Sequence, residues 1–506
     1  MTKFVDRLLN GVTMYRLVVY YLIFLLAVAI VLGALGILPY QPITLLFSVG
    51  FLVGVSAVAN KVFAWAYQVP ANTESVYISA LILALILDPV GPSHNLWFVG
   101  WAAVLAMASK YMVALDKKHL FNPVALGVAI AALALDQAAS WWVGSVPMLP
   151  FVLVGGLLIV LKIRRLELVA AFILSTLATV IGFSLLNHTN VMTAVQESFT
   201  ASPLLFFAFV FVTEPLTTPP TRGLQIIYGA LVGFLFAPQF HIGAFYLTPE
   251  LAMLGGNLFS YLVSPKAKLV LQLKEKIRIS PDVYDFTFAL SRPLAFQPGQ
   301  YMEWTLGHKD ADSRGNRRYF TLASTPDDRD LRMGVKFYPQ SSSYKTALLN
   351  MDVNDTIVAG QLAGDFVLDS DTKRKVIMIA GGIGVTPFRS MIKHMLDNRR
   401  RRPATLLYAN RRVEDILYRD VFDAAQKEIG LKVVYTLTDE TGVPKGWRGQ
   451  VGHIDRHMIL ETVPDYKYCT FYISGTNTMV HEVKDVLLSL GVKRSHIKTD
   501  YFPGLA

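Results

Sequence analysis

Hydrophobic and polar positions divide the chain into two unlike halves. The first half consists of long apolar runs separated by short polar segments. Such runs are typical of membrane helices, which need roughly 20 apolar residues to cross a bilayer. We therefore predict a polytopic α-helical membrane domain over residues 1–265 with about ten spans, several of them shorter than a straight crossing. The runs lie near 17–38, 43–60, 74–90, 96–112, 121–137, 148–161, 166–186, 203–216, 224–237 and 242–263.

The second half has the patterns of a globular protein. Short alternating segments joined by Pro, Gly and Asp turns predict a small antiparallel β-barrel domain over residues 268–372. From Lys375 the pattern becomes strand, glycine loop and helix, repeated, which predicts a parallel α/β nucleotide-binding domain over residues 373–506. The expected fold is multidomain. The predicted barrel strands are 269–274, 283–290, 301–306, 318–323 and 332–337.

The positions of the charged residues also predict how the apolar half is oriented in the membrane. The net charge is +10 although only 17% of residues are charged. Within the apolar half, Lys and Arg fall only on alternate loops, which is the bias of cytoplasmic loops in membrane proteins. We expect a multi-pass protein of the cell membrane with both termini in the cytoplasm, the lipid bilayer as a partner, and no nucleic acid partner.

Few metal ligands are available for electron transfer. Cys469 is the only cysteine, which excludes a cluster held by about four thiolates within this chain. No apolar run carries a histidine pair, so a transmembrane heme path is not expected. We predict no metal centre.

The barrel contains residues suited to a flavin. A flavin needs an aromatic face for its ring, a hydroxyl near its N5 edge, and cationic and amide donors for its phosphates. Strand alternation places Arg318 and Phe320 on one face and Thr321 on the other. By itself this segment also fits a barrel strand with an exposed arginine.

The α/β domain opens with a buried strand that runs into a glycine loop. The loop reads Gly381-Gly382-Ile383-Gly384-Val385-Thr386-Pro387. Thr386 can cap the following helix, and free amides at such a helix end bind phosphate. Pro387 holds the place of the third glycine of the dinucleotide fingerprint, so this motif alone does not support a classical Rossmann fold.

These motifs, in this order, resemble the ferredoxin–NADP reductase superfamily over roughly the last 240 residues. The resemblance implies that Arg318, Ser342 and Ser343 hold the phosphates of FAD, and that Phe320 and Thr321 contact its ring. It also implies that Gly382, Gly384 and Thr386 receive NAD(P)H, with Ser474 and Gly475 near the nicotinamide. The remaining matching segments are Gly364-Asp365-Phe366, Ser474-Gly475-Thr476 with Met479, and Asp500-Tyr501-Phe502.

By the same resemblance, the catalytic group comprises Thr321, Ser474 and Phe502. Two positions depart from the family pattern: Phe320 replaces a tyrosine, and Ser474 replaces a cysteine. Arg411 and Arg412 could read a 2′-phosphate whereas Glu414 would repel one, so NADH and NADPH both remain open.

The apolar half resembles the membrane flavoprotein family that contains the B subunit of the sodium-pumping NADH:quinone oxidoreductase and the D subunit of the Rnf complex. Residues 119–123 (HLFNP) and 213–223 (TEPLTTPPTRG) carry this resemblance. It implies a domain that holds flavin and passes electrons through the membrane. Family members carry FMN esterified to a threonine, and Ser202 holds the corresponding place here. The alternative is that Ser202 caps a helix whose first turn contains Pro203.

Together these features predict a membrane-bound NAD(P)H oxidoreductase. Electrons would pass through FAD into or across the membrane to an acceptor that is a quinone, a flavin or a redox protein. Two alternatives remain. One is a reductase for a soluble acceptor that the apolar half merely tethers, and the other is a redox-driven ion transporter in which Glu214 binds the ion.

Overall fold

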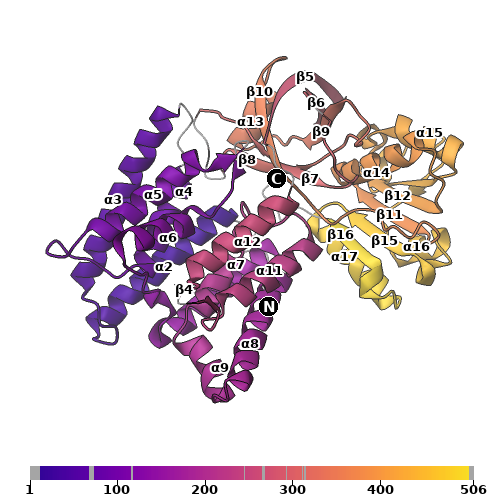
Figure 1. The fold of residues 1–506 in the computed structure, drawn as a ribbon. Helices are drawn as coiled ribbons and strands as arrows, with labels where there is room; N and C mark the ends of the chain where they lie inside the picture. Colours follow the sequence, from indigo (N-terminus) through magenta and orange to yellow (C-terminus); the bar gives the residue numbers. More distant parts are fainter. Residues whose placement is uncertain are drawn as a thin grey trace. The chain divides into compact units, whose positions relative to one another are not determined.

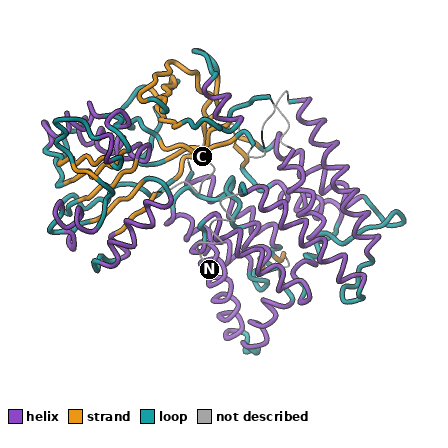
Figure 2. Tube along the Cα trace, turned by 180° about the vertical axis from the view of Figure 1, so that it is seen from behind, coloured by secondary structure: helices purple, strands orange, loops and turns teal. Residues whose placement is uncertain are grey.

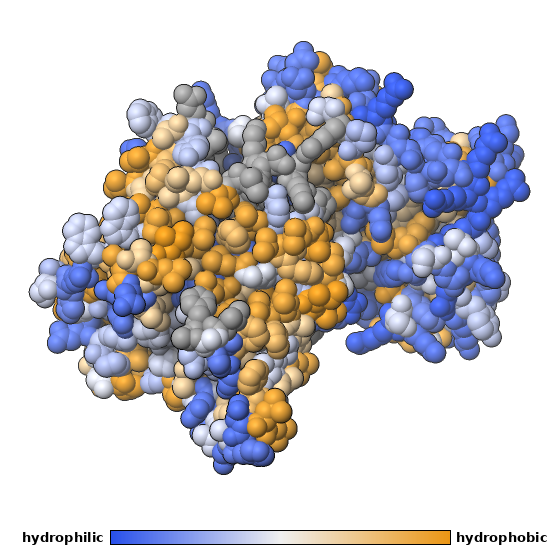
Figure 3. Space-filling view, viewed as in Figure 1, coloured by the Kyte–Doolittle hydropathy of each residue, from blue (hydrophilic) through white to orange (hydrophobic). Residues whose placement is uncertain are grey.

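The computed structural model describes residues 12–67, 73–115, 118–243, 245–264, 268–291, 293–309, 312 and 315–500. The chain forms two compact units, Met1–Ala267 and Lys268–Ala506, which are described separately below (Figure 1). On the face shown in Figure 3, hydrophobic residues dominate the first unit and hydrophilic residues dominate the second.

The first unit is a bundle of helices (Figure 2). Each predicted apolar run contains a helix, because strongly apolar runs with few polar breaks satisfy their backbone hydrogen bonds locally. The helices are α2 (Met14–Ala34), α3 (Pro42–Ala66), α4 (Thr73–Ile86), α5 (Trp97–Met112), α6 (Pro123–Leu135), α7 (Leu149–Ile163), α8 (Leu166–Leu186), α9 (Val191–Thr200), α10 (Leu204–Phe206) with the π-helix η3 (Phe207–Phe211), α11 (Arg222–Phe236) and α12 (Pro249–Val263).

The predicted count of about ten spans is not supported by the helix lengths. Four described helices are long and apolar enough to cross a membrane: Met14–Ala34, Pro42–Ala66, Val146–Ile163 and Leu166–Leu186. The pair Val191–Thr200 and Leu204–Phe211, bent by 61°, would be a fifth if it counts as one span. The other helices are shorter, since prolines and polar residues begin or end them.

The first unit contains the same arrangement twice. In each copy a helix ends two or three residues before an acidic residue that is followed by proline. A second helix, a two-stranded hairpin and a third helix with proline in its first turn then follow. The acidic residues are Asp88 and Glu214, and the interval from Pro89 to Pro123 equals that from Pro215 to Pro249. The hairpins are β1 (Ala114–Leu115) with β2 (Lys118–His119), and β3 (His241–Ile242) with β4 (Phe245–Tyr246).

The two acidic residues have different surroundings. The Glu214 carboxylate accepts hydrogen bonds from Asn122 Nδ2 at 2.6 Å and from Thr217 Oγ1 at 3.0 Å. The backbone amide of Asn122 in turn donates to Asn257 Oδ1 at 2.7 Å. Asp88 is exposed and accepts from the Tyr40 hydroxyl at 3.2 Å. One copy therefore supplies a buried polar cluster and the other a solvated carboxylate.

The second unit begins with the predicted antiparallel barrel. Six strands pair in the order β8-β7-β10-β5-β6-β9, and α13 (Ser343–Leu349) follows β9. The sequence did not indicate β10, nor the second half of β5. The strands are β5 (Leu269–Ser280), β6 (Val283–Ala289), β7 (Tyr301–Thr305), β8 (Arg317–Thr321), β9 (Asp330–Lys336) and β10 (Thr356–Ala363).

A six-stranded parallel sheet forms the rest of this unit, in the order β14-β13-β12-β11-β15-β16. Its central strands are buried and mostly apolar because helices cover both faces. The strands are β11 (Val376–Gly381), β12 (Ala404–Asn410), β13 (Lys432–Leu437), β14 (Gln450–Val451), β15 (Thr470–Ser474) and β16 (Ile497–Asp500). The helices are α14 (Thr386–Asp397), α15 (Arg419–Ile429), α16 (Arg456–Thr462) and α17 (Asn477–Ser489).

Candidate functional site

Strand β8 presents the predicted flavin residues as alternation requires. The Arg318 guanidinium lies 5.0 Å from the centre of the Tyr344 ring, and the Phe320 ring lies 6.3 Å from the same ring. Tyr319 points the other way, where its hydroxyl donates to Glu303 at 2.8 Å. Arg318 and Phe320 thus share one face of the strand, next to the start of α13.

The predicted phosphate-binding serines begin α13. Ser342 is the N-cap, and its hydroxyl accepts from the Lys345 amide at 3.3 Å. The Ser343 amide donates to the Asp312 carboxylate at 2.9 Å, and the Ser343 hydroxyl accepts from the Asp312 amide at 2.8 Å. Asp312 also lies 3.9 Å from the Arg318 guanidinium. The Asp312 carboxylate thus occupies the Ser343 amide, which the resemblance assigns to phosphate, and a bound phosphate would take its place there.

The residues around β8 fit a flavin. Thr321 is 4% exposed, and its hydroxyl has no hydrogen-bond partner among the described residues, which is a costly state for a buried polar group. A bound ring edge would satisfy this hydroxyl. Together with a cation and helix-end amides next to the strand, Thr321 completes the donor set that FAD requires. Arg318, Phe320, Thr321, Ser342 and Ser343 are therefore the residues that would hold it.

The glycine loop takes a shape that only small residues allow. Gly382 has φ +52°, and a Cβ added at Gly384 would lie 2.6 Å from the backbone of Ser474 and Gly475. The loop and the end of β15 therefore press directly against each other. The structure brings the predicted nucleotide residues of these two segments together, although they lie far apart in the sequence.

The predicted cap at Thr386 is wrong. A short 3₁₀ turn, Gly382–Val385, precedes α14, so Thr386 is already the first helical residue. Its hydroxyl donates to the Ile383 carbonyl at 2.8 Å instead of accepting from a helix amide. Pro387 lies in the first turn as predicted.

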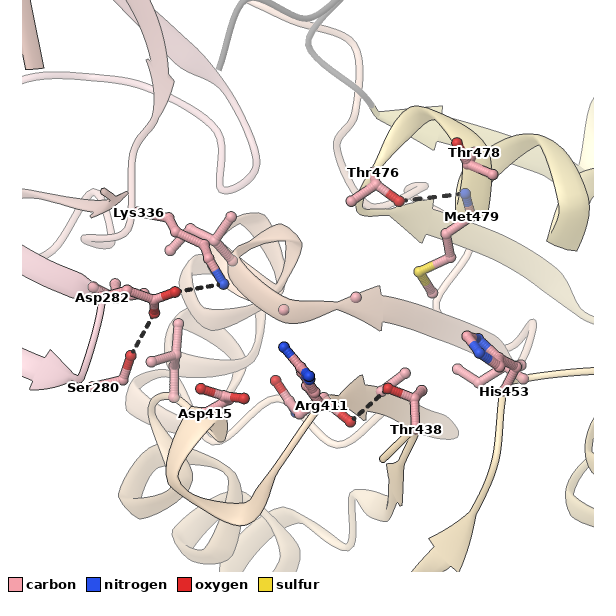
Figure 4. A pocket seen from close by; sticks show the side chains of 18 of the residues that line it. Ser280, Asp282, Lys336, Arg411, Asp415, Thr438, His453, Thr476, Thr478 and Met479 are labelled. Carbon is pink, nitrogen blue, oxygen red and sulfur yellow. Dashed lines mark hydrogen bonds and ion pairs between the residues drawn. The ribbon is translucent and has the colours of Figure 1, made fainter. Parts of the chain in front are cut away.

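A pocket of about 300 Å³ opens at the carboxyl ends of the parallel strands (Figure 4). Ligands of parallel α/β sheets bind at this edge. The glycine loop forms one wall, and Thr476 and Met479 at the start of α17 form another. The Thr476 hydroxyl accepts from the Met479 amide at 3.4 Å.

Several residues that line the pocket were not predicted. The barrel contributes Asp282 and Lys336, which form an ion pair at 2.8 Å, and the α/β domain contributes Asn410 and His453. They come from strand ends and loops of two different sheets, so no local motif marks them. The one sequence signal that could have found these pocket residues is their position at the end of a strand.

Charged side chains surround the pocket beyond β12. Asp439 lies 3.3 Å from the Arg412 guanidinium and 3.8 Å from that of Arg411. Hydrogen bonds from the Thr441 hydroxyl and from Arg412 lower the pKa of Asp439. A carboxylate thus competes for both arginines that could read a 2′-phosphate.

A buried carboxylate joins the barrel to the α/β domain. Asp285 lies 3.2 Å from the Arg332 guanidinium and accepts from the Tyr418 hydroxyl at 3.3 Å. The Arg389 guanidinium packs 5.1 Å from the centre of the Tyr418 ring. Burial raises the pKa of Asp285 to about 6, against the opposing effect of the two arginines.

Two predicted site residues remain. Phe502 lies outside the described residues. Ser202 lies at the bend between α9 and α10, where its hydroxyl donates to the Ser198 carbonyl at 2.7 Å. The N-cap of α10 is Pro203, so the expectation that Ser202 caps this helix is wrong.

Comparison with known proteins agrees with this geometry. The family model described as "Oxidoreductase NAD-binding domain" matches residues 378–485. NADH-cytochrome b5 reductase 1 from Aspergillus terreus is 32% identical over 234 residues, which cover 44% of this chain and 78% of the relative. The glycine betaine monooxygenase reductase subunit from Chromohalobacter salexigens is 28% identical over 227 residues, covering 44% of this chain and 60% of that protein.

The cytochrome b5 reductase domain of Ulva prolifera nitrate reductase is 25% identical, with a TM-score of 0.42, and covers 47% of this chain and 98% of that one. The chain therefore belongs to the family of FAD- and NAD(P)H-binding oxidoreductases of the ferredoxin–NADP reductase type, which includes the NADH-cytochrome b5 reductases. Within this class, it is a form in which an apolar helical unit precedes the reductase unit.

Proposed function

We propose that this protein is a membrane-bound oxidoreductase that takes electrons from NAD(P)H and passes them, through FAD, into or across the membrane. The observation that carries the proposal is one chain with two kinds of unit. One has a complete nucleotide-binding edge, and the other is a bundle of apolar helices with four long enough to cross a bilayer. A simple anchor needs one such helix.

When bound, FAD supplies a group that accepts a hydride from NAD(P)H and can release electrons one at a time. The side chains position the reactants and take no proton from the substrate. Arg318 and the amides at the start of α13 would bind phosphate, while Thr321 would donate to the ring edge. The glycine loop and Gly475 would let the dinucleotide approach the backbone closely, next to Ser474 at the end of β15.

The membrane step can be tested in proteoliposomes that hold ferricyanide inside. NADH or NADPH added outside reaches only outward-facing reductase units, and neither it nor ferricyanide crosses the bilayer. We expect NAD(P)H oxidation coupled to reduction of the trapped ferricyanide, alone or after a lipid-soluble quinone is added. Oxidation only with ferricyanide outside would contradict the proposal and favour the tethered reductase for a soluble acceptor.

A second flavin extends this proposal. We propose Ser202 as the attachment site because, in the sequence resemblance to the membrane flavoprotein family, it stands at the position of the FMN-bearing threonine, and because it is only partly buried. Its hydroxyl is accessible to a transferase once the bond to Ser198 opens. In protein co-produced with a flavin transferase, fluorescence that survives denaturation and is lost in Ser202→Ala would support attachment. An unmodified intact mass would reject it.

The buried polar cluster around Glu214 favours a second candidate, redox-driven ion transport. Carboxylates inside an apolar bundle are expensive and usually functional. Glu214→Gln keeps an oxygen acceptor but removes the charge. We expect this variant to oxidise NADH without the ion uptake of the wild type. Absence of NADH-driven uptake in the wild type would eliminate this candidate and leave electron transfer untouched.

A further inference from the structure

The edge of the parallel sheet opposite the nucleotide pocket is rich in basic side chains. Parallel strands all begin at the same edge, so the segments that precede β11, β12, β15 and β16 come together there. Each of them carries Lys or Arg. We give the name basic edge to six of the exposed side chains: Lys373, Arg399, Arg401, Lys467, Lys493 and Arg494.

Hydrogen bonds hold these segments side by side. The Arg374 side chain donates to the Tyr468 carbonyl at 3.2 Å and contacts His496 Nδ1 at 2.9 Å. The Arg402 side chain donates to the Asp369 and Asp371 carbonyls at 2.9 and 2.6 Å. The edge is therefore a fixed surface, built from segments more than a hundred positions apart.

The positive charge at this edge is not neutralised locally. Among the described residues, no member of the basic edge forms an ion pair. Two carboxylates of these segments are already occupied, because Asp465 pairs with Lys375 at 2.7 Å and Asp369 pairs with Lys498. The remaining carboxylate of these segments, Asp371, balances one of the six positive charges. This leaves an excess of positive charge facing solvent.

An aromatic side chain projects from the same surface. Tyr468 is 79% exposed, which is unusual for a tyrosine in a folded domain. Tyrosine next to Lys and Arg is typical of surfaces that sit at the boundary between lipid and water. A ring of this kind can enter the headgroup layer while its hydroxyl stays hydrated.

The position of the basic edge distinguishes between two kinds of partner, an acidic redox protein and an anionic membrane surface. An acidic redox protein must dock close to the flavin, which the site places between the barrel and the carboxyl ends of the strands. The basic edge lies at the other ends of the same strands. A flat anionic surface has no such requirement, and about 1 kcal/mol per Lys or Arg is gained near anionic lipids.

We propose that the basic edge, with Tyr468 inserted, docks the reductase unit onto the anionic phospholipid surface of the membrane that the helical unit occupies. This rests on the proposal that the helical unit spans a membrane. Docking would hold the unit in one orientation and leave the nucleotide pocket open to solvent.

The experiment uses the full chain in nanodiscs with a fluorophore on Ser495→Cys, which lies within the basic edge. Native Cys469 is buried, and burial raises the pKa of its thiol to about 11, so labelling is selective. Lipids with a headgroup nitroxide report contact as quenching. We expect quenching in discs with about 30 mol% phosphatidylglycerol, little in purely zwitterionic discs, and loss in about 0.5 M NaCl. A label at Glu440→Cys, at the opposite edge, should be unaffected.

A matched pair of variants tests the residues themselves. Each charge is worth about fivefold, so R401Q/K467Q/R494Q should lower the ratio of docked to undocked protein about 100-fold. K445Q/R448Q/R456Q removes three exposed charges near the carboxyl edge and should leave quenching and activity unchanged.

Three results would overturn the proposal. They are equal quenching in zwitterionic discs, no effect of the first triple variant, or a response only to an added acidic polypeptide, which would identify a protein partner. Failure of the chain to enter nanodiscs at all would instead refute the membrane proposal on which this one rests.

Discussion

The contact between the glycine loop and the end of β15 gives the sharpest prediction. In Gly384→Ala, the new methyl would lie 2.6 Å from backbone atoms of Ser474 and Gly475. Backbone atoms cannot rotate away, so the loop or the strand end must move by roughly 1 Å. Overpacking of this kind costs about 2 kcal/mol. A displacement of about 1 Å at a site that positions reactants costs about 100-fold in rate.

The nearby Gly382 supplies a matched control. Nothing lies within 4 Å of a Cβ added there, but its φ of +52° is unfavourable for alanine. Gly382→Ala should therefore cost about 1 kcal/mol through backbone strain alone. It leaves the packing of the loop on Gly475 intact.

Both variants are measured in the full chain in detergent. For Gly384→Ala we expect kcat/KM for NADH, with ferricyanide as acceptor, to fall about 100-fold. We also expect the temperature of FAD release to fall by about 4–8 °C. Gly382→Ala should lose less than tenfold in kcat/KM. Wild-type kcat/KM in Gly384→Ala, or a larger loss in Gly382→Ala, would refute the view that this contact positions the nucleotide.

Three further predictions follow from the site. Arg318→Ala should weaken FAD retention by at least tenfold, because it removes the cation nearest the serines of α13; flavin content after gel filtration measures this, and full retention would contradict the assigned role. Asp439→Asn should raise kcat/KM for NADPH relative to NADH several-fold, because it releases Arg411 and Arg412 from their carboxylate; an unchanged ratio would show that neither arginine faces the 2′ position. Asp285 has a pKa raised to about 6 from 3.8. A carboxyl whose pKa is raised in this way binds its proton more tightly in the folded state, so stability should fall by about 3 kcal/mol as pH rises from about 3 to about 7. Asp285→Asn should flatten that slope in thermal unfolding, and an unaltered slope would show that another group causes it.

Local patterns predicted those features that depend on local chemistry. Alternation was enough to put Arg318 and Phe320 on one face. Strand β10 was missed because a bulge, with Gln361 at φ +48°, interrupts its apolar pattern. The helix cap at Thr386 was wrong because a 3₁₀ turn ahead of it extends the helix, which a glycine motif does not reveal.

Contacts between distant segments were not predictable in the same way. Lys336 meets the pocket only because the barrel packs against the parallel sheet. The Asp312 carboxylate reaches the donors of Ser343 through a loop whose course no periodicity describes. The helix lengths support fewer spans than the hydropathy pattern predicts, because hydropathy records apolar runs, whereas proline and polar caps set where the helices begin and end.

The doubled arrangement in the helical unit has an evolutionary consequence. A duplicated segment starts with two equivalent carboxylates, and selection on either one is relaxed as long as the other serves. Here Glu214 has become enclosed by Asn122 and Thr217, while Asp88 remains in solvent beside Tyr40. The sequence should therefore change faster around Asp88 than around Glu214. Among descendants of the same duplication, the position of Asp88 is expected to vary freely and that of Glu214 to stay acidic.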